Sequence, residues 1–320
     1  MSDVNTSAGS PLVSVVVLNY KRRDALVRVL ESVRRQDYSR REIIVVDNNS
    51  QDDIGEFIGS YAPEVELIEL KENLGACGGR NAGIERARGA IVVTLDNDIF
   101  FESTTELSEI VRTFQTRPDV HVLAFYLGDA DTGKVRSREW CHPRNMADSS
   151  LAEFETDYFV EGAAAYRREV FSEAGNYYEP IFIGCEGHDL ALRILDRNFL
   201  ILYAPQIRAR HLMSAQTRSL ERTFHTYTRN FIWVAYKDYR FLGGMRFLLP
   251  KLAMMAYFSV RVGQVGAYLR GVKDGFAGLR RVRSDRTPIS RSTAIYLAKL
   301  EKLRPNLLVR FARHRASPQI

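Results

Sequence analysis

Cysteine is scarce in this chain of 320 residues: its three cysteines, Cys77, Cys141 and Cys185, lie far apart and form no C-x-x-C pair. This scarcity argues against a disulfide framework or a structural zinc site and suits a reducing compartment. Residues 1–11 lack the basic stretch and apolar run of a secretory signal, so we expect a flexible tail there and a cytoplasmic protein. Internal repeats and low-complexity tracts are missing as well.

The net charge of +6 is unevenly distributed along the chain. Residues 237–320 hold 18 Lys and Arg against 4 Asp and Glu, a net charge of +14, and the rest of the chain holds 27 basic against 35 acidic residues, a net charge of −8. We therefore expect two regions with different partners: a catalytic domain at 12–235 and a basic helical region at 236–320. No nucleic-acid recognition motif accompanies the basic residues, so nucleic acid is not an expected partner.

The basic region contains apolar segments interrupted by arginine. Residues 252–260 are uncharged, but nine residues are too few to cross a bilayer. The mixture of apolar and basic residues at 247–270 is typical of a helix that lies on an anionic membrane surface, here the inner face of the membrane. A helical subdomain that packs on the catalytic body with solvated charges is the alternative, and both interpretations can hold together.

Short apolar runs alternate with helix-like segments in the first hundred residues. The predicted strands cover 13–18, 42–46, 65–70 and 90–95, and the helices between them cover about 23–35, 53–60 and 81–87. Continuous β-branched runs indicate strands that are buried on both faces, and the intervening helices indicate crossovers. We expect an α/β fold, a Rossmann-like and mostly parallel sheet with helices on both faces. Further along, the pattern predicts a strand at 160–166, a helix at 186–197 and a short strand at 199–203.

A polar motif follows each of the four predicted strands. The motifs are Asn-Tyr-Lys-Arg at 19–22, Asp-Asn-Asn-Ser at 47–50, the glycine-rich segment 72–81 and Asp-Asn-Asp at 96–98. Any one of them could be an ordinary turn or helix cap. Ligands of such sheets bind beyond the carboxyl ends of the strands, and four polar motifs at one edge favour a binding site there.

Asp96 and Asp98 are the candidate metal ligands. Residues i and i+2 of an extended chain project to the same side, so both carboxylates can face one cation. Oxygen ligands of this kind suit Mg²⁺ or Mn²⁺ bridged to phosphate oxygens. The glycine-rich segment, with Arg80 near its end, can bring backbone N–H groups to a phosphate or can form a flexible turn, and it matches neither the P-loop nor the Rossmann signature.

Taken together, these motifs resemble family 2 glycosyltransferases of the GT-A fold, over residues 12–215, and within them the rhamnosyltransferase-like group. The resemblance implies an inverting, metal-dependent enzyme of class EC 2.4. Its partners would be a nucleoside-diphosphate sugar donor and a hydroxyl acceptor on a glycan, glycolipid or natural product. By motif, the resemblance implies donor contacts from Asn19, Tyr20, Arg22, Asp47, Asn49, Asn73, Gly78, Arg80, Asn81, Asp96, Asn97 and Arg218, and metal contacts from Asp98, Asp96 and His211.

The segment 185–193 resembles the family's Glu-Asp-x-Asp-Leu motif, in which an acid is the catalytic base. Gly187 stands where many members have the second acid, which leaves Glu186 and Asp189 as candidates. On a helix these two residues share a face. A carboxylate is needed because the acceptor hydroxyl loses its proton during attack. Glu186 could instead be an ordinary acid at a helix N-terminus, and Asp189 could orient Arg193.

Two other functions remain open at this point. Sugar-phosphate nucleotidyltransferases also bind a nucleotide at the strand ends, but they usually carry a glycine-rich basic loop after the first strand, and residues 19–22 contain no glycine. A non-catalytic membrane-surface protein would use the basic region alone. The sequence leaves the oligomeric state open.

Overall fold

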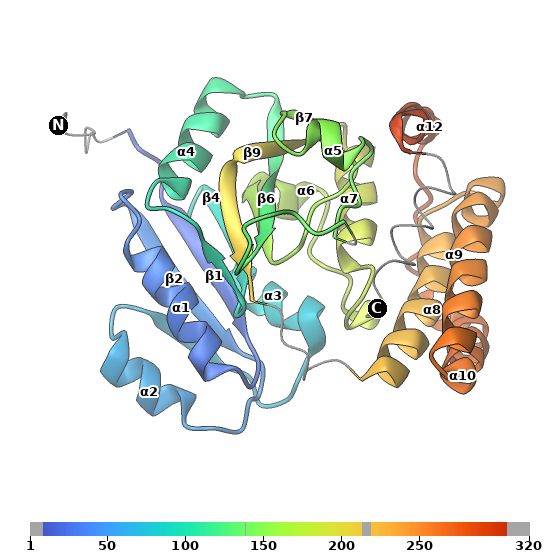
Figure 1. Cartoon of the computed structure of the whole chain (residues 1–320), viewed down its shortest axis with the longest axis horizontal. Helices are drawn as coiled ribbons and strands as arrows, with labels where there is room; N and C mark the ends of the chain where they lie inside the picture. The colour runs from blue at the N-terminus through green and yellow to red at the C-terminus, as the bar shows by residue number, and fades with distance from the viewer. Residues whose placement is uncertain (1–8, 138, 213–218, 306–320) are drawn as a thin grey trace.

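The computed structural model describes residues 9–137, 139–212 and 219–305. Within them the chain forms an α/β body with a layer of helices on one side (Figure 1). The strands are β1 (Val13–Asn19), β2 (Arg41–Asp47), β3 (Glu66–Glu69), β4 (Ile91–Asp96), β5 (Ile99–Phe101), β6 (Val120–Asp129), β7 (Phe154–Glu155), β8 (Ala163–Arg167) and β9 (Leu200–His211). The helices of the body are α1 (Arg23–Arg34), α2 (Ile54–Tyr61), α3 (Gly75–Arg86), α4 (Glu106–Thr116), α5 (Met146–Ser149), α6 (Glu169–Glu173) and α7 (Glu186–Asp196), with a 3₁₀ turn at Glu179–Ile181.

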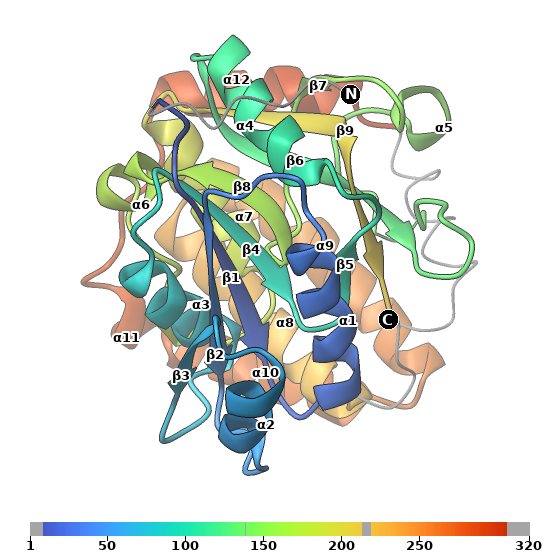
Figure 2. The same cartoon turned by 90° about the vertical axis from the view of Figure 1, so that its left-hand side faces the viewer.

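All the strands of the described residues join one sheet in the order β3-β2-β1-β4-β8-β6-β9-β5, and β7 pairs with β9. The four predicted strands are adjacent and parallel, which confirms the α/β fold. The second half makes the sheet mixed rather than mostly parallel, because β8 runs antiparallel to both β4 and β6. Figure 2 views the sheet from the side of α1 and α2.

Both faces of the sheet are buried, as the continuous β-branched runs predict. In β1, Val13, Val15 and Val17 belong to the core under α1, α2 and α4, whereas Val16 belongs to the core that includes α7. Side chains of a strand alternate between its faces, so one apolar run serves two cores. A strand of this kind fixes helices on both sides of the site at its end.

The strand β9 is longer than the sequence pattern predicts. It continues through Pro205 to His211, whereas we expected it to end at residue 203. Proline cannot donate to the ladder, and the pairing of β6 with β9 shifts register between Phe125 and Tyr126, opposite this proline. The irregularity lets the strand resume and carry His211 to the sheet edge where the polar motifs lie.

The glycine-rich segment is also different from our expectation, since it forms a helix rather than a loop. Helix α3 begins at Gly75 and includes residues 81–86 of the predicted helical segment, and Gly79 and Gly83 face the sheet. A Cβ on Gly83 would lie 2.3 Å from Val16 Cγ1, and one on Gly79 would lie 2.5 Å from Leu18 Cδ1. The close approach of α3 to β1 explains these glycines and gives the helix an inward-facing Arg80.

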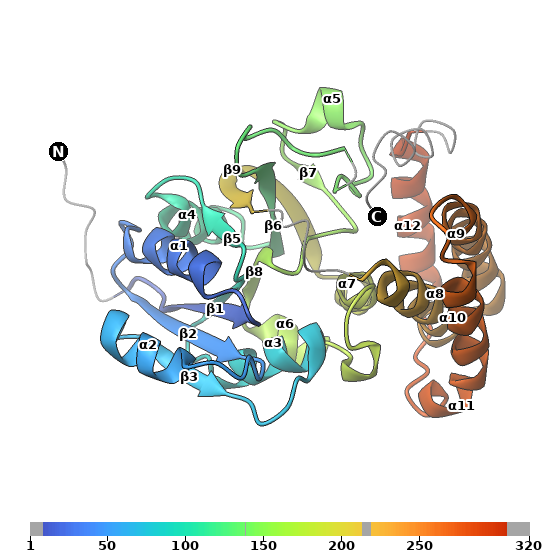
Figure 3. The same cartoon turned by 60° about the horizontal axis from the view of Figure 1, so that its bottom comes forward.

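The helical layer consists of α8 (Leu220–Lys237), α9 (Phe241–Arg261), α10 (Val265–Ala277), α11 (Leu279–Val282) and α12 (Arg291–Leu303). Phe224 and Ile232 of α8 pack with Leu248 and Phe258 of α9 in a small core of their own. Figures 1 and 3 show these helices together on one side of the body. Helix α8 crosses the predicted boundary at 235/236, and that boundary stays a prediction. None of the described helices is long and apolar enough to span a bilayer.

Replacing Gly83 by alanine should destabilise the protein by about 1–3 kcal/mol, the usual cost of overpacking. The new methyl group would meet Val16 at 2.3 Å and Val46 Cγ2 at 2.9 Å. The matched control is Gly59→Ala in α2, where a Cβ meets nothing within 4 Å and alanine favours the helix. Urea unfolding of both variants measures the difference, and equal stability of the two would contradict the proposed packing.

Candidate functional site

The polar ends of β1, β2 and β4 meet in one hydrogen-bonded cluster. Asn19 Nδ2 donates to Asp47 Oδ1 at 2.8 Å, and Asn97 Nδ2 donates to Asn19 Oδ1 at 2.7 Å. The strands are in register here, with Asn19 opposite Asp47 and Leu18 opposite Asp96. The predicted convergence of these motifs at the sheet edge is therefore present in the structure.

The loop after β2 is held by its own side chains. Asp47 Oδ2 accepts from the backbone N–H of Ser50 at 2.9 Å, and Ser50 Oγ accepts from the N–H of Lys21 at 2.9 Å. Asn49 adopts a left-handed conformation with φ of +62°. Tyr20, in the loop after β1, is among the exposed large side chains. The loops after β1 and β2 are thus connected by hydrogen bonds and form one side of the site.

Two of the predicted donor residues, Asn73 and Asn81, hold α3 in place through hydrogen bonds, and a third, Gly78, is buried within this helix. Asn73 Oδ1 accepts from the N–H of Gly75 at 2.8 Å and so closes the turn before the helix. Gly78 is buried against Leu74. Asn81 exchanges two hydrogen bonds of 2.9 Å with the backbone of Tyr177. The structure therefore gives these residues a role in placing the helix.

Arg80 lies at the centre of the site with only 3% of its surface exposed. Its Nη2 donates to Asp96 Oδ1 at 2.5 Å, and its Nη1 lies 3.6 Å from Glu186 Oε1. A buried guanidinium needs compensating carboxylates, and here they come from β4 and from α7. Within the described residues, Nε and Nη1 of this side chain have no hydrogen-bond acceptor. Arg80 therefore joins β4 to α7, and its Nε and Nη1 atoms are free to donate hydrogen bonds to a ligand.

Asp98 belongs to a second group of charges. It pairs with Arg22, and its Oδ2 lies 3.6 Å from His211 Nε2. His211 Nδ1 in turn lies 3.3 Å from Glu139 Oε1. Burial lowers the pKa of His211, but the carboxylates of Asp98 and Glu139 outweigh it and raise the pKa to about 9. Burial acts to raise the pKa of Asp98, and His211 and Arg22 bring it below its ordinary value.

The two aspartates of the Asp-Asn-Asp motif consequently have different neighbours. We expected Asp96 and Asp98 to face one cation because they stand two apart in extended chain. The strand ends at Asp96, and residues 97–98 form a turn, so the extended alternation no longer applies. Asp96 pairs with Arg80, whereas Asp98 pairs with Arg22 and lies near His211.

The donor atoms around Asp98 fit a divalent cation only in part. No group of three or more His, Cys, Asp and Glu side chains among the described residues is arranged to hold a metal. Asp98 and His211 offer one carboxylate oxygen and one imidazole nitrogen within 3.6 Å of each other. Mg²⁺ commonly takes one or two protein ligands and completes its shell with substrate phosphates and water. A two-residue site that needs a diphosphate for completion fits this chemistry.

Glu186 and Asp189 share helix α7 but have different surroundings. Asp189 is 0% exposed, and its carboxylate pairs with Arg193 at 2.7 Å and Lys237 at 2.6 Å. Burial acts to raise the pKa of Asp189, but these two cations lower it to about 2. Burial raises the pKa of Glu186, and Arg80 only partly opposes this shift. Glu186 faces the cluster, because its carboxylate lies 3.6 Å from Arg80, and Asp189 connects α7 to the helical layer through Lys237.

The structure brings two acids to the site that were not among the predicted site residues, Glu139 and Glu161, although the segment that begins at Glu161 resembles the family's acceptor-side strand. Glu139 contacts His211 from the irregular segment after β6, which has no periodicity that could have revealed it. Glu161 precedes β8, and its Oε1 accepts from the N–H of Gly187 at 2.6 Å. The one hint in the sequence was Gly187 itself, because a missing acid in this motif suggests that another acid takes its place. Arg218, the remaining predicted donor residue, lies outside the described residues.

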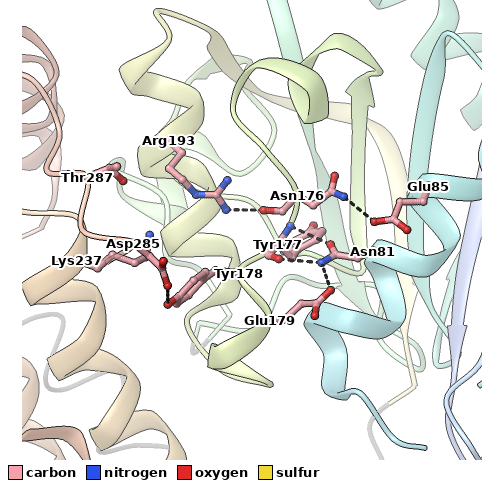
Figure 4. A pocket seen from close by; sticks show the side chains of 10 residues that line it. All are labelled: Asn81, Glu85, Asn176, Tyr177, Tyr178, Glu179, Arg193, Lys237, Asp285 and Thr287. Atoms are coloured by element: carbon pink, nitrogen blue, oxygen red, sulfur yellow. Dashed lines mark hydrogen bonds between the residues drawn. The ribbon is translucent and has the colours of Figure 1, made fainter. Parts of the chain in front are cut away.

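A pocket of about 360 Å³ lies away from the strand ends, between α3, α7 and the helical layer, and Asn81 is part of its lining (Figure 4). Its lining includes Arg193, Lys237, Tyr178 and Asp285, and Tyr178 donates to Asp285 at 2.5 Å. Asn81 is the one predicted donor residue in this lining. The chemistry of the strand ends is absent from it, so we place the candidate active site at the strand ends.

Comparisons with known proteins agree with this geometry. A family model described as "Glycosyl transferase family 2" matches residues 14–175, which is half of the chain. The chain belongs to glycosyl transferase family 2. It is therefore a glycosyltransferase, of class EC 2.4, as the motifs predicted, while the rhamnosyltransferase-like group is not distinguished by these comparisons.

Several curated proteins are similar to this family 2 member. An uncharacterised protein of Haemophilus influenzae is 26% identical over 54% of this chain and 96% of its own length. The uncharacterised glycosyltransferase YwdF of Bacillus subtilis is 27% identical over 52% of this chain and 61% of its own. The succinoglycan biosynthesis protein ExoO of Rhizobium meliloti is 30% identical over 54% and 47%. The chain thus spans about half to two thirds of the latter two relatives.

Solved structures confirm the fold. The mannosyltransferase PcManGT of Pyrobaculum calidifontis superposes with a TM-score of 0.56 at 16% identity, over 97% of this chain and 88% of that one. GalNAc-T7 superposes with a TM-score of 0.61 at 15% identity, over 78% and 52%. At this level of identity the likeness concerns the GT-A arrangement of strands and helices.

Replacing Arg80 by methionine should destabilise the protein by about 3–5 kcal/mol, because Glu186 and Asp96 lose their shared counter-charge. The loss should be smaller at pH 5 than at pH 8, since protonation of the buried Glu186 removes the unpaired charge. Arg112→Met is the control, because Arg112 pairs with Glu109 on the exposed face of α4 and should change stability little. Equal unfolding midpoints for the two variants would show that Arg80 does not hold the site together.

Proposed function

We propose that this glycosyltransferase moves a sugar from a nucleoside-diphosphate sugar to a hydroxyl of a glycan, a glycolipid or a natural product, with inversion at the anomeric carbon. The observation that carries the proposal is the polar cluster at the strand ends, where Arg80 joins Asp96 to Glu186 and Asp98 lies beside His211. The similar PcManGT was solved in complex with GDP-Man and Mn²⁺, and GalNAc-T7 with UDP, GalNAc and Mn²⁺. These ligands support a nucleotide and Mg²⁺ or Mn²⁺ at the same edge of this sheet.

In this proposal the loops after β1 and β2 bind the nucleoside, with Asp47 and Asn19 directed to the base or ribose and Tyr20, Arg22 and Asn49 around them. Asp96 and Asn97 lie next along the edge. Asp98 and His211 hold the cation. A bound Mg²⁺ or Mn²⁺ supplies positive charge to the leaving diphosphate. Arg80 adds a buried positive charge close to the same place, and we propose Arg218 as a further contact to the diphosphate.

We place the catalytic base at the start of α7, where Glu186 faces the polar cluster. The acceptor hydroxyl must give up its proton while it attacks, and an acid that faces the polar cluster can receive it. The carboxylate of Asp189 is fully buried between two cations, so we propose that it positions α7. A nucleotidyltransferase would instead join a nucleoside triphosphate to a sugar phosphate and release pyrophosphate, so release of pyrophosphate from that mixture would identify the other reaction.

A donor panel tests the proposed function. Calorimetric titration with UDP-, dTDP- and GDP-sugars, a rhamnose donor among them, should show binding to one nucleotide that requires Mn²⁺ or Mg²⁺, accompanied by slow hydrolysis of that donor. Asp98→Asn should weaken this binding at least 10-fold because one of two protein ligands is lost. Asp119→Asn, at an exposed pair with Arg117, is the control. Folded protein that binds none of these donors with either metal would refute the proposal.

We also propose that the helical layer binds the anionic inner face of a membrane. Helix α9 contains no Asp or Glu, and Phe241, Leu242, Leu249 and Val260 expose 56–77% of their surfaces. Residues 242, 249 and 260 stand 7 and 11 apart, so they lie along one face of the helix. The net charge of +14 at 237–320 is complementary to anionic lipid, and the scarcity of cysteine suits the reducing side.

Vesicle sedimentation tests the membrane surface on the full chain. Wild-type protein should sediment with vesicles containing about 30% phosphatidylserine and less so in high salt, since electrostatic attraction is screened. A Phe241→Ser, Leu242→Ser double variant should lose most of this binding. The control is Leu151→Ser, which removes an equally exposed leucine from the α/β body. If the double variant sediments like wild type, or wild type stays in the supernatant, α9 does not bind lipid.

A further inference from the structure

The start of α7 is closed in by Glu161. Gly187 is the second residue of the helix, and a Cβ at this position would lie 2.1 Å from Glu161 Oε1. The N–H of Gly187 donates to the same oxygen at 2.6 Å. The carboxylate of Glu161 therefore occupies the space in which a side chain at position 187 would begin.

The backbone of Glu161 is fixed against β4, the strand that ends in Asp96. Thr94 Oγ1 donates to the carbonyl of Glu161 at 2.5 Å, and the N–H of Asp96 donates to the carbonyl of Gly162 at 3.3 Å. A Cβ on Gly162 would meet the Asp96 carboxylate at 2.4 Å. Glu161 thus enters the site from a segment that also packs on the proposed donor side, and its place does not depend on a mobile loop.

Two acids and one cation meet at this point. Glu186 is 5% exposed and lies 3.6 Å from Arg80 Nη1, while Glu161 is half-buried. Arg80 is shared with Asp96. One guanidinium that pairs with two carboxylates and acts on Glu161 through its charge cannot neutralise all three acids, and like charges in a buried site disfavour full ionisation.

Burial, with the neighbouring charge of Glu186, raises the pKa of Glu161 to about 7. An acid with such a pKa is well matched to proton transfer at neutral pH. The charged and titratable groups that act on Glu161 or on its partner are Glu186, Arg80, Asp96, Cys77, Cys141, Cys185, Tyr158, Tyr166 and Tyr177.

We propose that Glu161 supplies the acid that Gly187 lacks and is the general base of the transfer, with Glu186 held beside it by Arg80. The inference rests on the proposed function and names a catalytic residue for it. The acceptor oxygen forms its bond to the anomeric carbon as the bond from that carbon to the diphosphate oxygen breaks. The hydroxyl proton passes to the ionised Glu161 carboxylate, and the nucleoside diphosphate leaves with the electron pair of the broken bond.

The first test separates chemistry from binding. Glu161→Gln should lower the turnover of the sugar nucleotide that binds in the donor panel, with water as acceptor, about 100-fold, and its Kd with Mn²⁺ should change less than about threefold. Glu169→Gln, an exposed acid on α6, should behave as wild type. Full turnover in Glu161→Gln, with loss in Glu186→Gln, would overturn the proposal and make Glu186 the base.

The pH dependence gives a readout that a merely structural residue would not move. Because the base acts in its ionised form, turnover of wild type should fall as the pH drops below about 7. Glu186→Gln removes the neighbouring negative charge, so its acidic limb should shift to lower pH. An acidic limb at the same pH in wild type and Glu186→Gln would contradict the pairing of the two acids.

A third measurement needs no donor. In protein labelled with ¹³C at the glutamate carboxyl carbons, one signal that is absent from Glu161→Gln should titrate near pH 7. If that signal titrates near pH 4.5, the proposal fails even when donors bind. If no donor binds while the signal titrates near 7, the proposed function fails and the shared environment of the two acids stands. The methyl group of Gly187→Ala needs the space that the Glu161 carboxylate occupies, so this variant should shift the Glu161 signal. When Glu161→Ala is already present, adding Gly187→Ala should not lower the turnover further.

Discussion

A guanidinium that is 3% exposed must be neutralised, and the need to neutralise Arg80 organises the site. Its two carboxylate partners come from elements far apart in the sequence, Asp96 at the end of β4 and Glu186 at the start of α7. The ion pair forms only if α3 lies close to β1, and Gly79 and Gly83 allow this approach. The low helix propensity of the glycines is the cost of placing a cation between the two halves of the site.

The helical layer contributes to the same site from behind. Asn230 of α8 donates to the carbonyls of Ile181, Ile183 and Gly184, just before α7 begins. Cys185, which follows, adopts a left-handed backbone with φ of +75°, a conformation that a residue with a side chain rarely takes without support. Lys237, at the end of α8, pairs with Asp189 inside α7. The layer therefore supports α7 through hydrogen bonds to the segment before it and an ion pair within it.

Sequence patterns predicted what depends on local periodicity and failed where packing decides. The first four strands follow from continuous β-branched runs, because burial on both faces leaves no other pattern, and their polar ends converge as the parallel register requires. The glycine-rich start of α3 was unpredictable from propensity, since glycines there serve contact with β1. Asp96 and Asp98 separate because the chain turns at the intervening residue, a detail that spacing alone does not encode. Glu139 and Glu161 reach the site only through tertiary structure.

A side chain at position 187 and the carboxylate of Glu161 cannot occupy the same space at the start of α7. An atom at the Cβ position of residue 187 and the present place of the Glu161 carboxylate are 2.1 Å apart, so a side chain at 187 and this placement of Glu161 are incompatible. An acid can reach this point either from α7 or from the segment before β8, and in this chain the second route is used. Glycine at 187 then has two functions, to vacate the space and to donate its N–H to the carboxylate that fills it. The lack of a side chain at Gly187 is therefore the condition under which Glu161 can occupy this place.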